Sequence, residues 1–371
     1  MPRQQVISRL ARHFEVVWIE PPEGWRHYWL GPGLFQRASR GPETSIAGLT
    51  HYDPGRWLPE VYRPAWLRHS LARRRVRNAR RLLERKGCTS IVAYLWRYEF
   101  AWALDEAAAD LSCYHIDDEY TFSVEEKPND PAEVELLRKV DFVIVHSPKL
   151  MEKKGGINPD TISVPNGVNY AAYSRPAAEP ADLAAIPHPR MGYVGVVKTQ
   201  LNFELLLDLS RRRPDWSFVL VGPSGYLGEK AVVVAELSKR PNVWLLGNRT
   251  LAELPGYVQH MDACVMCYEV NSYTNYIYPL KLHEYLATGR PVVSSPINSV
   301  IPFAGVVRLA SSTDEWEAAL DQALKPASTA PGAAASRQSV AAAYDWDLLV
   351  DKIASAFRDR LASKPPRSRA G

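Results

Sequence analysis

Short apolar segments alternate with amphipathic stretches along the 371 residues of the chain. In the first half, the predicted strands are residues 14–20, 91–96, 111–116, 142–146 and 162–164. In the second half, they are residues 191–197, 217–221, 242–246, 263–268, 291–295 and 306–309. Strands that alternate with helices in this way are typical of parallel sheets covered by helices, so the pattern predicts an α/β fold.

A segment rich in Ala and Pro divides the chain into two predicted domains. We expect an N-terminal domain over residues 1–170, a linker over 171–190 and a C-terminal domain over 191–343. Residues 344–361 predict a final helix, and the polar residues 362–371 predict a disordered tail. A second Ala-, Ser- and Pro-rich stretch, residues 326–336, predicts a flexible surface loop. The order of elements favours two Rossmann-like domains that face each other across a cleft.

The most informative motif is the run from Tyr278 to Val293. Pro279 can begin a helix because its missing N–H would have no partner there, and Gly289 can end the helix in the left-handed conformation. The free N–H groups of the first turn then face an anion, and Lys281 adds a full positive charge beside them. A diphosphate fits such a site.

This run, Pro-Leu-Lys-Leu-His-Glu-Tyr-Leu-Ala-Thr-Gly-Arg-Pro-Val-Val, resembles the donor-binding signature of GT-B glycosyltransferases. It is most similar to the retaining family-4 type that builds bacterial teichuronic acids and exopolysaccharides. Further segments that resemble this family start at residues 164, 193, 219 and 242, and the likeness covers about residues 90–355. The resemblance implies a UDP- or GDP-linked sugar as donor, a glycan or lipid-linked acceptor, transfer with retention, and a last helix that crosses back to the first domain.

The resemblance also implies which residues bind the donor. Glu284 would hold the ribose hydroxyls, Lys281 would hold the diphosphate, and Gly195 with Lys198 would receive the diphosphate from the other side. Gly222 and Leu280 would complete the donor site. The alternative interpretation of Lys281 is an exposed residue of the helix, and that of Glu284 is a carboxylate that interacts with the helix dipole.

One donor position departs from the family's commonest pattern, since Tyr276 stands where many members have a Glu. The residue that contacts the donor sugar is therefore open at this point. The candidates lie in the polar segment just upstream of the motif: Asn271, Tyr273, Asn275 and Tyr276.

On the acceptor side, polar residues follow two predicted strands. Asp117 and Asp118 come after one strand, which also contains His115, and these three are candidates for binding or deprotonating an acceptor hydroxyl. His146 and Ser147 follow the next strand and are expected to lie on the acceptor side as well. Loop capping is the alternative interpretation for each Asp.

The start of the chain departs from the resembled family, in which a strand precedes the first helix. Here the predicted helix begins at about Pro2 and runs to Leu10. Either the start was assigned too late or the N-terminal domain lacks its first strand, and a missing strand would remove hydrogen-bonding partners from its sheet.

Charge is concentrated in the N-terminal quarter. Residues 1–90 contain 17 Lys and Arg against 7 Asp and Glu, although the whole chain has a net charge of only +4. Many of these bases lie between Arg68 and Lys86, over a predicted apolar stripe, where they form either a solvated face or a surface that docks on anionic lipid. No run of about 18 apolar residues and no leader is visible, so a cytoplasmic protein is expected, peripheral on the inner face of the plasma membrane if the lipid hypothesis holds. No nucleic-acid partner is expected.

No cofactor or metal is expected. Because two Lys residues and helix N-termini can neutralise a diphosphate, the motif predicts metal-independent transfer, and Asp117-Asp118 is not interpreted as a metal pair. Two alternatives to a cell-envelope glycosyltransferase stay open: a sugar-nucleotide epimerase on the same fold, and a non-catalytic carbohydrate-binding or scaffold protein.

Overall fold

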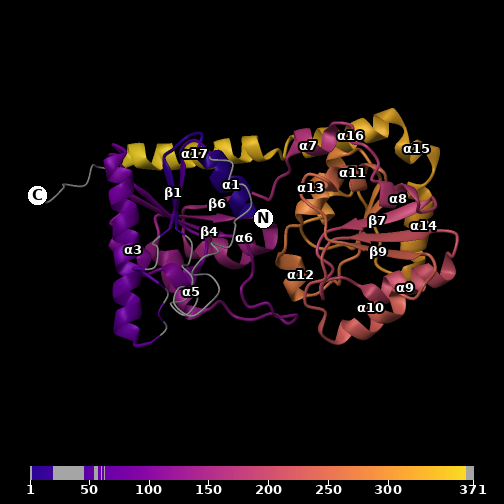
Figure 1. Cartoon of the computed structure of the whole chain (residues 1–371), viewed down its shortest axis with the longest axis horizontal. Helices are drawn as coiled ribbons and strands as arrows, with labels where there is room; N and C mark the ends of the chain where they lie inside the picture. The colour runs from indigo at the N-terminus through magenta and orange to yellow at the C-terminus, as the bar shows by residue number, and fades with distance from the viewer. Residues whose placement is uncertain (1, 20–45, 54–56, 60, 62, 365–371) are drawn as a thin grey trace, which may run out of the picture.

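A computed structural model describes residues 2–19, 46–53, 57–59, 61 and 63–364 (Figure 1). The chain forms two units, in each of which helices cover parallel sheets. Two connecting segments that lie close together join the units. The elements of the N-terminal unit are α1 (Pro2–Leu10), β1 (Val16–Ile19), β2 (Leu49–Tyr52), α3 (Ala65–Arg85), β3 (Val92–Leu95), η2 (Tyr98–Phe100), α4 (Ala103–Ala107), β4 (Leu111–Ile116), α5 (Pro131–Lys139), β5 (Phe142–Val145), α6 (Pro148–Lys154), η3 (Gly155–Ile157) and β6 (Thr161–Ser163).

The second unit and the return helix make up the rest of the chain. Their elements are α7 (Tyr170–Ser174), α8 (Ala181–Ala184), β7 (Arg190–Val194), α9 (Phe203–Arg212), β8 (Ser217–Val221), η4 (Gly228–Lys230), α10 (Ala231–Leu237), β9 (Val243–Gly247), α11 (Leu254–Gln259), β10 (Ala263–Met266), α12 (Ser272–Tyr276), α13 (Leu280–Ala287), β11 (Val292–Ser294), η5 (Ile301–Phe303), β12 (Arg308–Leu309), α14 (Thr313–Ala323), α15 (Pro326–Thr329), α16 (Pro331–Ala342) and α17 (Trp346–Ser363).

The C-terminal sheet is continuous and entirely parallel. Its order is β12-β11-β10-β7-β8-β9, and β7 lies in the middle, paired in register with β8. Every residue of β7, β8 and β10 is buried, as expected for strands covered by helices on both faces. The carboxyl ends of these strands therefore meet at one edge of the sheet, which is where the site lies.

The N-terminal strands are parallel too, but they are divided between two sheets. One sheet has the order β3-β4-β5-β6, and the other contains only β1 and β2. Among the described residues, β1 pairs only with β2 and β3 pairs only with β4, so each leaves one edge without a strand. Strand β2 lies in a long connection where the sequence pattern predicted none.

The two units are joined where the chain passes twice between them. Val168 and Asp345 form a parallel bridge at these crossings, and the Asp345 carboxylate accepts hydrogen bonds from the N–H groups of Tyr170 and Asp347. From there α17 runs back across the N-terminal unit (Figure 1), where Ile353 and Phe357 pack with residues of α1. The return helix thus ties the end of the chain to its beginning.

Two segments differ from a simple linker or loop. Within residues 171–190, Leu183 and Ile186 are buried in the core of the C-terminal unit, and the segment contains α8 and all of α7 except Tyr170. The prediction of a flexible loop over residues 326–336 is wrong: α15 and the first half of α16 occupy it, and Ser328 is buried. Ala and Ser are compatible with a helix, and each of these two helices has a Pro at its N-terminal end. The predicted tail overlaps the end of α17, and residues 365–371 lie outside the described residues.

Candidate active site

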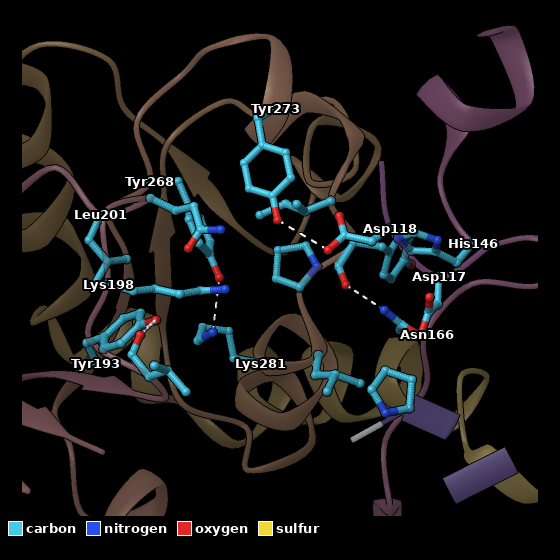
Figure 2. Close-up of a pocket in the computed structure, with 17 residues that line it drawn as sticks. Asp117, Asp118, His146, Asn166, Tyr193, Lys198, Leu201, Tyr268, Tyr273 and Lys281 are labelled. Atoms are coloured by element: carbon cyan, nitrogen blue, oxygen red, sulfur yellow. Dashed lines mark hydrogen bonds between the residues drawn. The ribbon is translucent and has the colours of Figure 1, made fainter. Parts of the chain in front are cut away.

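A cavity of about 230 Å³ lies between the two units and is lined by residues of both (Figure 2). Its N-terminal wall includes Asp117, Asp118, His146 and Asn166. Its C-terminal wall includes Val196, Lys198, Gln200, Tyr193, Tyr268, Tyr273, Tyr278, Leu280 and Lys281. We refer to this cavity as the pocket and to these two sets as its N-terminal and C-terminal walls.

Lys281 projects from the first turn of α13 into the C-terminal wall. Pro279 occupies the N-cap position rather than the first helical position, and Gly289 follows the helix with φ +75°, as the motif predicted. The Lys281 ammonium donates a hydrogen bond to the Tyr268 hydroxyl at 3.0 Å and lies 4.9 Å from the ring centroid of Tyr193. These aromatic rings hold the ammonium without neutralising it, so its charge is available to an anion.

Gly195 lets Lys281 approach the end of β7. Its φ of +151° is rarely adopted by residues with side chains, and an added Cβ would meet Lys281 Cε at 2.9 Å and Nζ at 3.0 Å. Gly222, at the end of β8, is packed closely as well, because a Cβ there would lie 2.1 Å from the Gly195 carbonyl oxygen. The glycines therefore allow two strand ends and one ammonium group to occupy the same small space.

Lys198 shares the pocket with Lys281. Burial lowers the pKa of Lys198, the positive charge of Lys281 lowers it further, and the carboxylate of Asp118 opposes both effects. Two ammonium groups in one partly enclosed pocket repel each other, and a bound anion would relieve that repulsion. The C-terminal wall is thus suited to a group with more than one negative charge.

Asp117 and Asp118 are neighbours in sequence with different surroundings. Asp117 receives two hydrogen bonds from the Arg3 guanidinium, at 2.7 and 3.1 Å, and one from the Tyr120 hydroxyl at 2.6 Å. Burial favours the protonated form of Asp117, but these contacts outweigh it and lower the pKa. Asp117 is therefore held as a structural carboxylate at the edge of the pocket.

Asp118 has weaker partners and faces across the pocket. It accepts a hydrogen bond from the backbone N–H of Glu119 at 2.8 Å and one from the hydroxyl of Tyr273, in the other unit, at 3.2 Å. Burial raises its pKa to about 6, and the charge of Asp117 contributes to the rise. A pair of carboxyl groups with pKa values shifted in opposite directions is typical of sites where one acid binds and the other exchanges a proton.

His146 lines the pocket with one ring nitrogen already used. Its Nδ1 donates to the Ile116 carbonyl at 2.9 Å, so in the neutral ring Nε2 is the acceptor. Burial lowers the pKa of His146, which favours the neutral form. His115 is also neutral, because burial lowers its pKa to about 3, but it stacks on Trp96 and does not line the pocket. Ser147 caps α6, and its hydroxyl accepts from the Leu150 N–H.

Several predicted donor residues lie outside the pocket lining. Glu284 is partly buried one turn after Lys281; burial raises its pKa, while Lys281 and a hydrogen bond from Tyr173 oppose the rise. The Asn275 side chain accepts from the Asn298 N–H, and the Tyr276 hydroxyl donates to Glu126 in the other unit. The donor-binding roles assigned to these residues stay predictions.

The sequence interpretation missed several polar residues of the lining: Asn166, Tyr193, Gln200, Tyr268 and Tyr278. Tyr268 is the last residue of a predicted strand and Asn166 lies in a segment that carried the family resemblance, so strand ends were the available signal. The Asn166 amide donates to the Tyr278 carbonyl at 2.8 Å, which links the two walls. Within the described residues, no three His, Cys, Asp or Glu side chains are grouped so that they could hold a metal ion.

Part of the chain is similar in sequence to known proteins. Residues 188–325 match the family of group 1 glycosyl transferases. A protein of Bacillus subtilis named as the teichuronic acid biosynthesis glycosyltransferase TuaH is 31% identical over 174 residues, which are 45% of this chain and 43% of that protein. The chain therefore matches less than half the length of this curated relative.

Solved structures resemble this one over most of its length. WaaG, a glycosyltransferase involved in lipopolysaccharide biosynthesis, has a TM-score of 0.58 at 14% identity, covering 96% of this chain and 94% of its own. A trehalose-6-phosphate protein from E. coli bound with UDP-2-fluoro glucose has a TM-score of 0.58 at 12% identity, covering 82% and 80%. Trehalose 6-phosphate synthase from Burkholderia multivorans has a TM-score of 0.60 at 13% identity, covering 81% and 78%. The chain thus has the two-domain GT-B fold, and its residues 188–325 are similar in sequence to the group 1 glycosyl transferases.

Proposed function

We propose that the chain transfers a sugar from a nucleoside diphosphate donor to a hydroxyl of a glycan or lipid-linked acceptor in bacterial cell-envelope or exopolysaccharide synthesis. The observation that carries this proposal is the convergence of Lys198 and Lys281 beside Gly195, opposite Asp118 and His146. Two cations on one wall suit the diphosphate of a donor. A carboxyl group and a neutral imidazole on the other wall suit a hydroxyl group.

The proposed chemistry proceeds with retention and without a metal. The bond between the anomeric carbon and the diphosphate oxygen breaks while the acceptor oxygen bonds to the same face of that carbon. The departing diphosphate takes the acceptor proton, and Lys281 and Lys198 stabilise its growing negative charge. Asp118 and His146 orient the acceptor hydroxyl by accepting hydrogen bonds from it or its neighbours.

A binding experiment tests the donor site first. Thermal unfolding is followed with UDP, GDP and their common sugars, on the native chain and on Lys281→Ala and Glu284→Ala. A ligand that binds only the folded state stabilises it by about 2.7 kcal/mol at a hundredfold excess over Kd. We expect one nucleotide to stabilise the native chain and neither variant. No stabilisation by any nucleotide would contradict the proposal.

Product analysis then separates the alternatives. Release of nucleotide from the donor without acceptor supports a transferase, whereas binding without release supports a scaffold protein. Release of nucleotide together with an altered free sugar supports an epimerase. Activity lost with a chelator and restored by manganese would contradict metal independence.

The N-terminal unit offers a surface for the proposed anionic membrane partner. Helix α3 exposes basic side chains along its length, although some form ion pairs, such as Arg73 and Arg77 with Glu106. Trp66, near the start of α3, is 71% exposed. Trp side chains are enriched at the headgroup layer of membranes. No helix among the described residues is long and apolar enough to span a bilayer. Flotation with anionic and neutral vesicles tests the proposal, and equal recovery with both would contradict it.

A further inference from the structure

The connection between β4 and α5, residues 117–130, reaches out of the N-terminal unit to α12 of the C-terminal unit (Figure 1). The backbone N–H of Ser272 donates to the carbonyl of Val124 at 3.2 Å. The rings of Phe122 and Tyr273 approach to 5.7 Å between centroids. Phe122 has φ +47°, a conformation that is costly for a residue with a side chain and persists where surrounding contacts hold it. The connection is therefore fixed against the other unit.

Glu126 is the centre of this contact. Its carboxylate accepts hydrogen bonds from the Tyr276 hydroxyl at 2.6 Å and the Ser272 hydroxyl at 2.7 Å, and it pairs with the Lys153 ammonium at 2.9 Å. Burial raises the pKa of Glu126, but these three contacts outweigh it and lower the pKa to about 2, so the group is ionised at neutral pH. We name these residues, Glu126, Lys153, Ser272 and Tyr276, the interdomain clasp.

Tyr276 enters the N-terminal unit with its whole side chain. Only 2% of its surface is exposed, and it belongs to the same apolar cluster as Tyr114, Ile116 and Leu136 of the N-terminal unit. The Lys153 ammonium lies 4.9 Å from its ring centroid. The position where many members of the resembled family have an acid is thus occupied here by a residue that joins the two units.

The clasp is anchored in the N-terminal unit by two neighbouring lysines of α6. Lys154 is fully buried and pairs with Glu133 at 2.7 Å and with Glu119 at 3.1 Å, while Lys153 reaches Glu126. Glu119 directly follows Asp118 in the chain. The same charge network therefore fixes both ends of the segment that carries the pocket carboxyl group.

We propose that Tyr276 and Glu126 are positioning residues, which hold α12 against the N-terminal unit and thereby place Tyr273 at hydrogen-bonding distance from Asp118 across the pocket. The clasp keeps the two walls together before substrates bind. The part of this inference that concerns turnover rests on the proposed function, whereas the part that concerns domain closure does not.

Small-angle X-ray scattering of the full chain without ligand tests the closure. Tyr276→Phe removes one hydroxyl and keeps the buried ring, and Glu126→Gln changes a group at the protein surface, so neither removes a core side chain. We expect each single variant to have a larger radius of gyration than the native chain. The double variant should show no larger increase than the single variants. Glu125→Gln is the matched control, because Glu125 lies in the same connection and its side chain is 80% exposed. Among the described residues, its only ion pair is with Lys127.

Turnover supplies a second measurement. The proposed donor site lies on the C-terminal wall, so KM for the donor should stay near the native value. We expect kcat to fall by about fivefold to tenfold, which corresponds to the net loss of one hydrogen bond. Scattering and kcat that match the native chain and Glu125→Gln would overturn the inference. A native chain without transferase activity would contradict the proposed function, and the scattering comparison would still decide whether the clasp exists.

Discussion

The two walls of the pocket are built in different ways. The C-terminal wall lies at the edge of one continuous sheet, where Gly195 and Gly222 permit close approach and Lys281 is held by aromatic rings. The N-terminal wall belongs to an interrupted sheet, and its groups depend on contacts with distant segments, such as Arg3 on Asp117. The difference teaches that backbone geometry prepares the first wall for an anion, whereas side-chain networks tune the second.

The largest expected effect comes from removing the charge at the centre of the C-terminal wall. Lys281→Ala should lower kcat for sugar transfer by about 10²- to 10³-fold, because a preorganised cation no longer stabilises the departing diphosphate. Steady-state kinetics with the identified donor measure this. Lys239→Ala, at an exposed position of the same unit, is the control. Equal rates in the two variants would mean that Lys281 has no role in the reaction.

A smaller effect is expected from displacing that ammonium group without removing it. Gly195→Ala places a Cβ against Lys281 Cε at a φ of +151°. We expect a loss of about 10- to 100-fold in turnover from misplacement, together with about 1–3 kcal/mol of stability from backbone strain. Gly305→Ala, where an added Cβ meets nothing within 4 Å, should change neither quantity. An active and stable Gly195→Ala protein would remove the close-approach argument.

The N-terminal wall should respond through pH. The pKa of Asp118 is raised to about 6 in the fold from an ordinary 3.8, so the native state binds the proton more tightly and loses stability as pH rises from about 4 to 6. Asp118→Asn removes this cost and should be more stable than the native chain at pH 7 by about 1–2 kcal/mol, allowing for solvent screening. Urea unfolding at pH 7 and at pH 4 measures it. The gain should vanish at pH 4, and a gain of equal size at both pH values would assign it to another cause.

The neighbouring carboxylate should show the opposite dependence and the smallest effect. The contacts of Asp117 lower its pKa in the folded state. The stability that they provide is therefore present at pH values above the ordinary pKa of an Asp, and it is lost as the pH falls through the lower pKa of the folded state. Arg3→Ala should therefore cost about 1 kcal/mol at pH 7 and less at low pH, since the pair is partly exposed. The same urea experiment applies, with the exposed Arg138→Ala as control. A cost that is independent of pH would indicate lost packing instead.

The sequence predicted the C-terminal half more fully than the N-terminal half. Strands such as residues 217–221 and 263–266 could be located because both faces are buried and the apolar runs are uninterrupted. The helix that carries Lys281 could be located from its flanking Pro and Gly. Strand β2 could not, because its four residues, Leu-Thr-His-Tyr, have no apolar run and are only partly buried or exposed.

The sequence by itself determined the alternation of parallel strands and helices, the helix from Leu280 to Ala287 and the positions of glycines at the ends of strands. These features follow from local rules of periodicity, capping and backbone freedom. Only the tertiary structure decided that Asp117 pairs with Arg3 while Asp118 faces the pocket. It also decided that Tyr276 joins the two units and does not line the pocket. The physical reason is that the partners are far apart in the chain, 114 residues for Arg3 and Asp117 and 150 for Glu126 and Tyr276, and only folding brings them into contact.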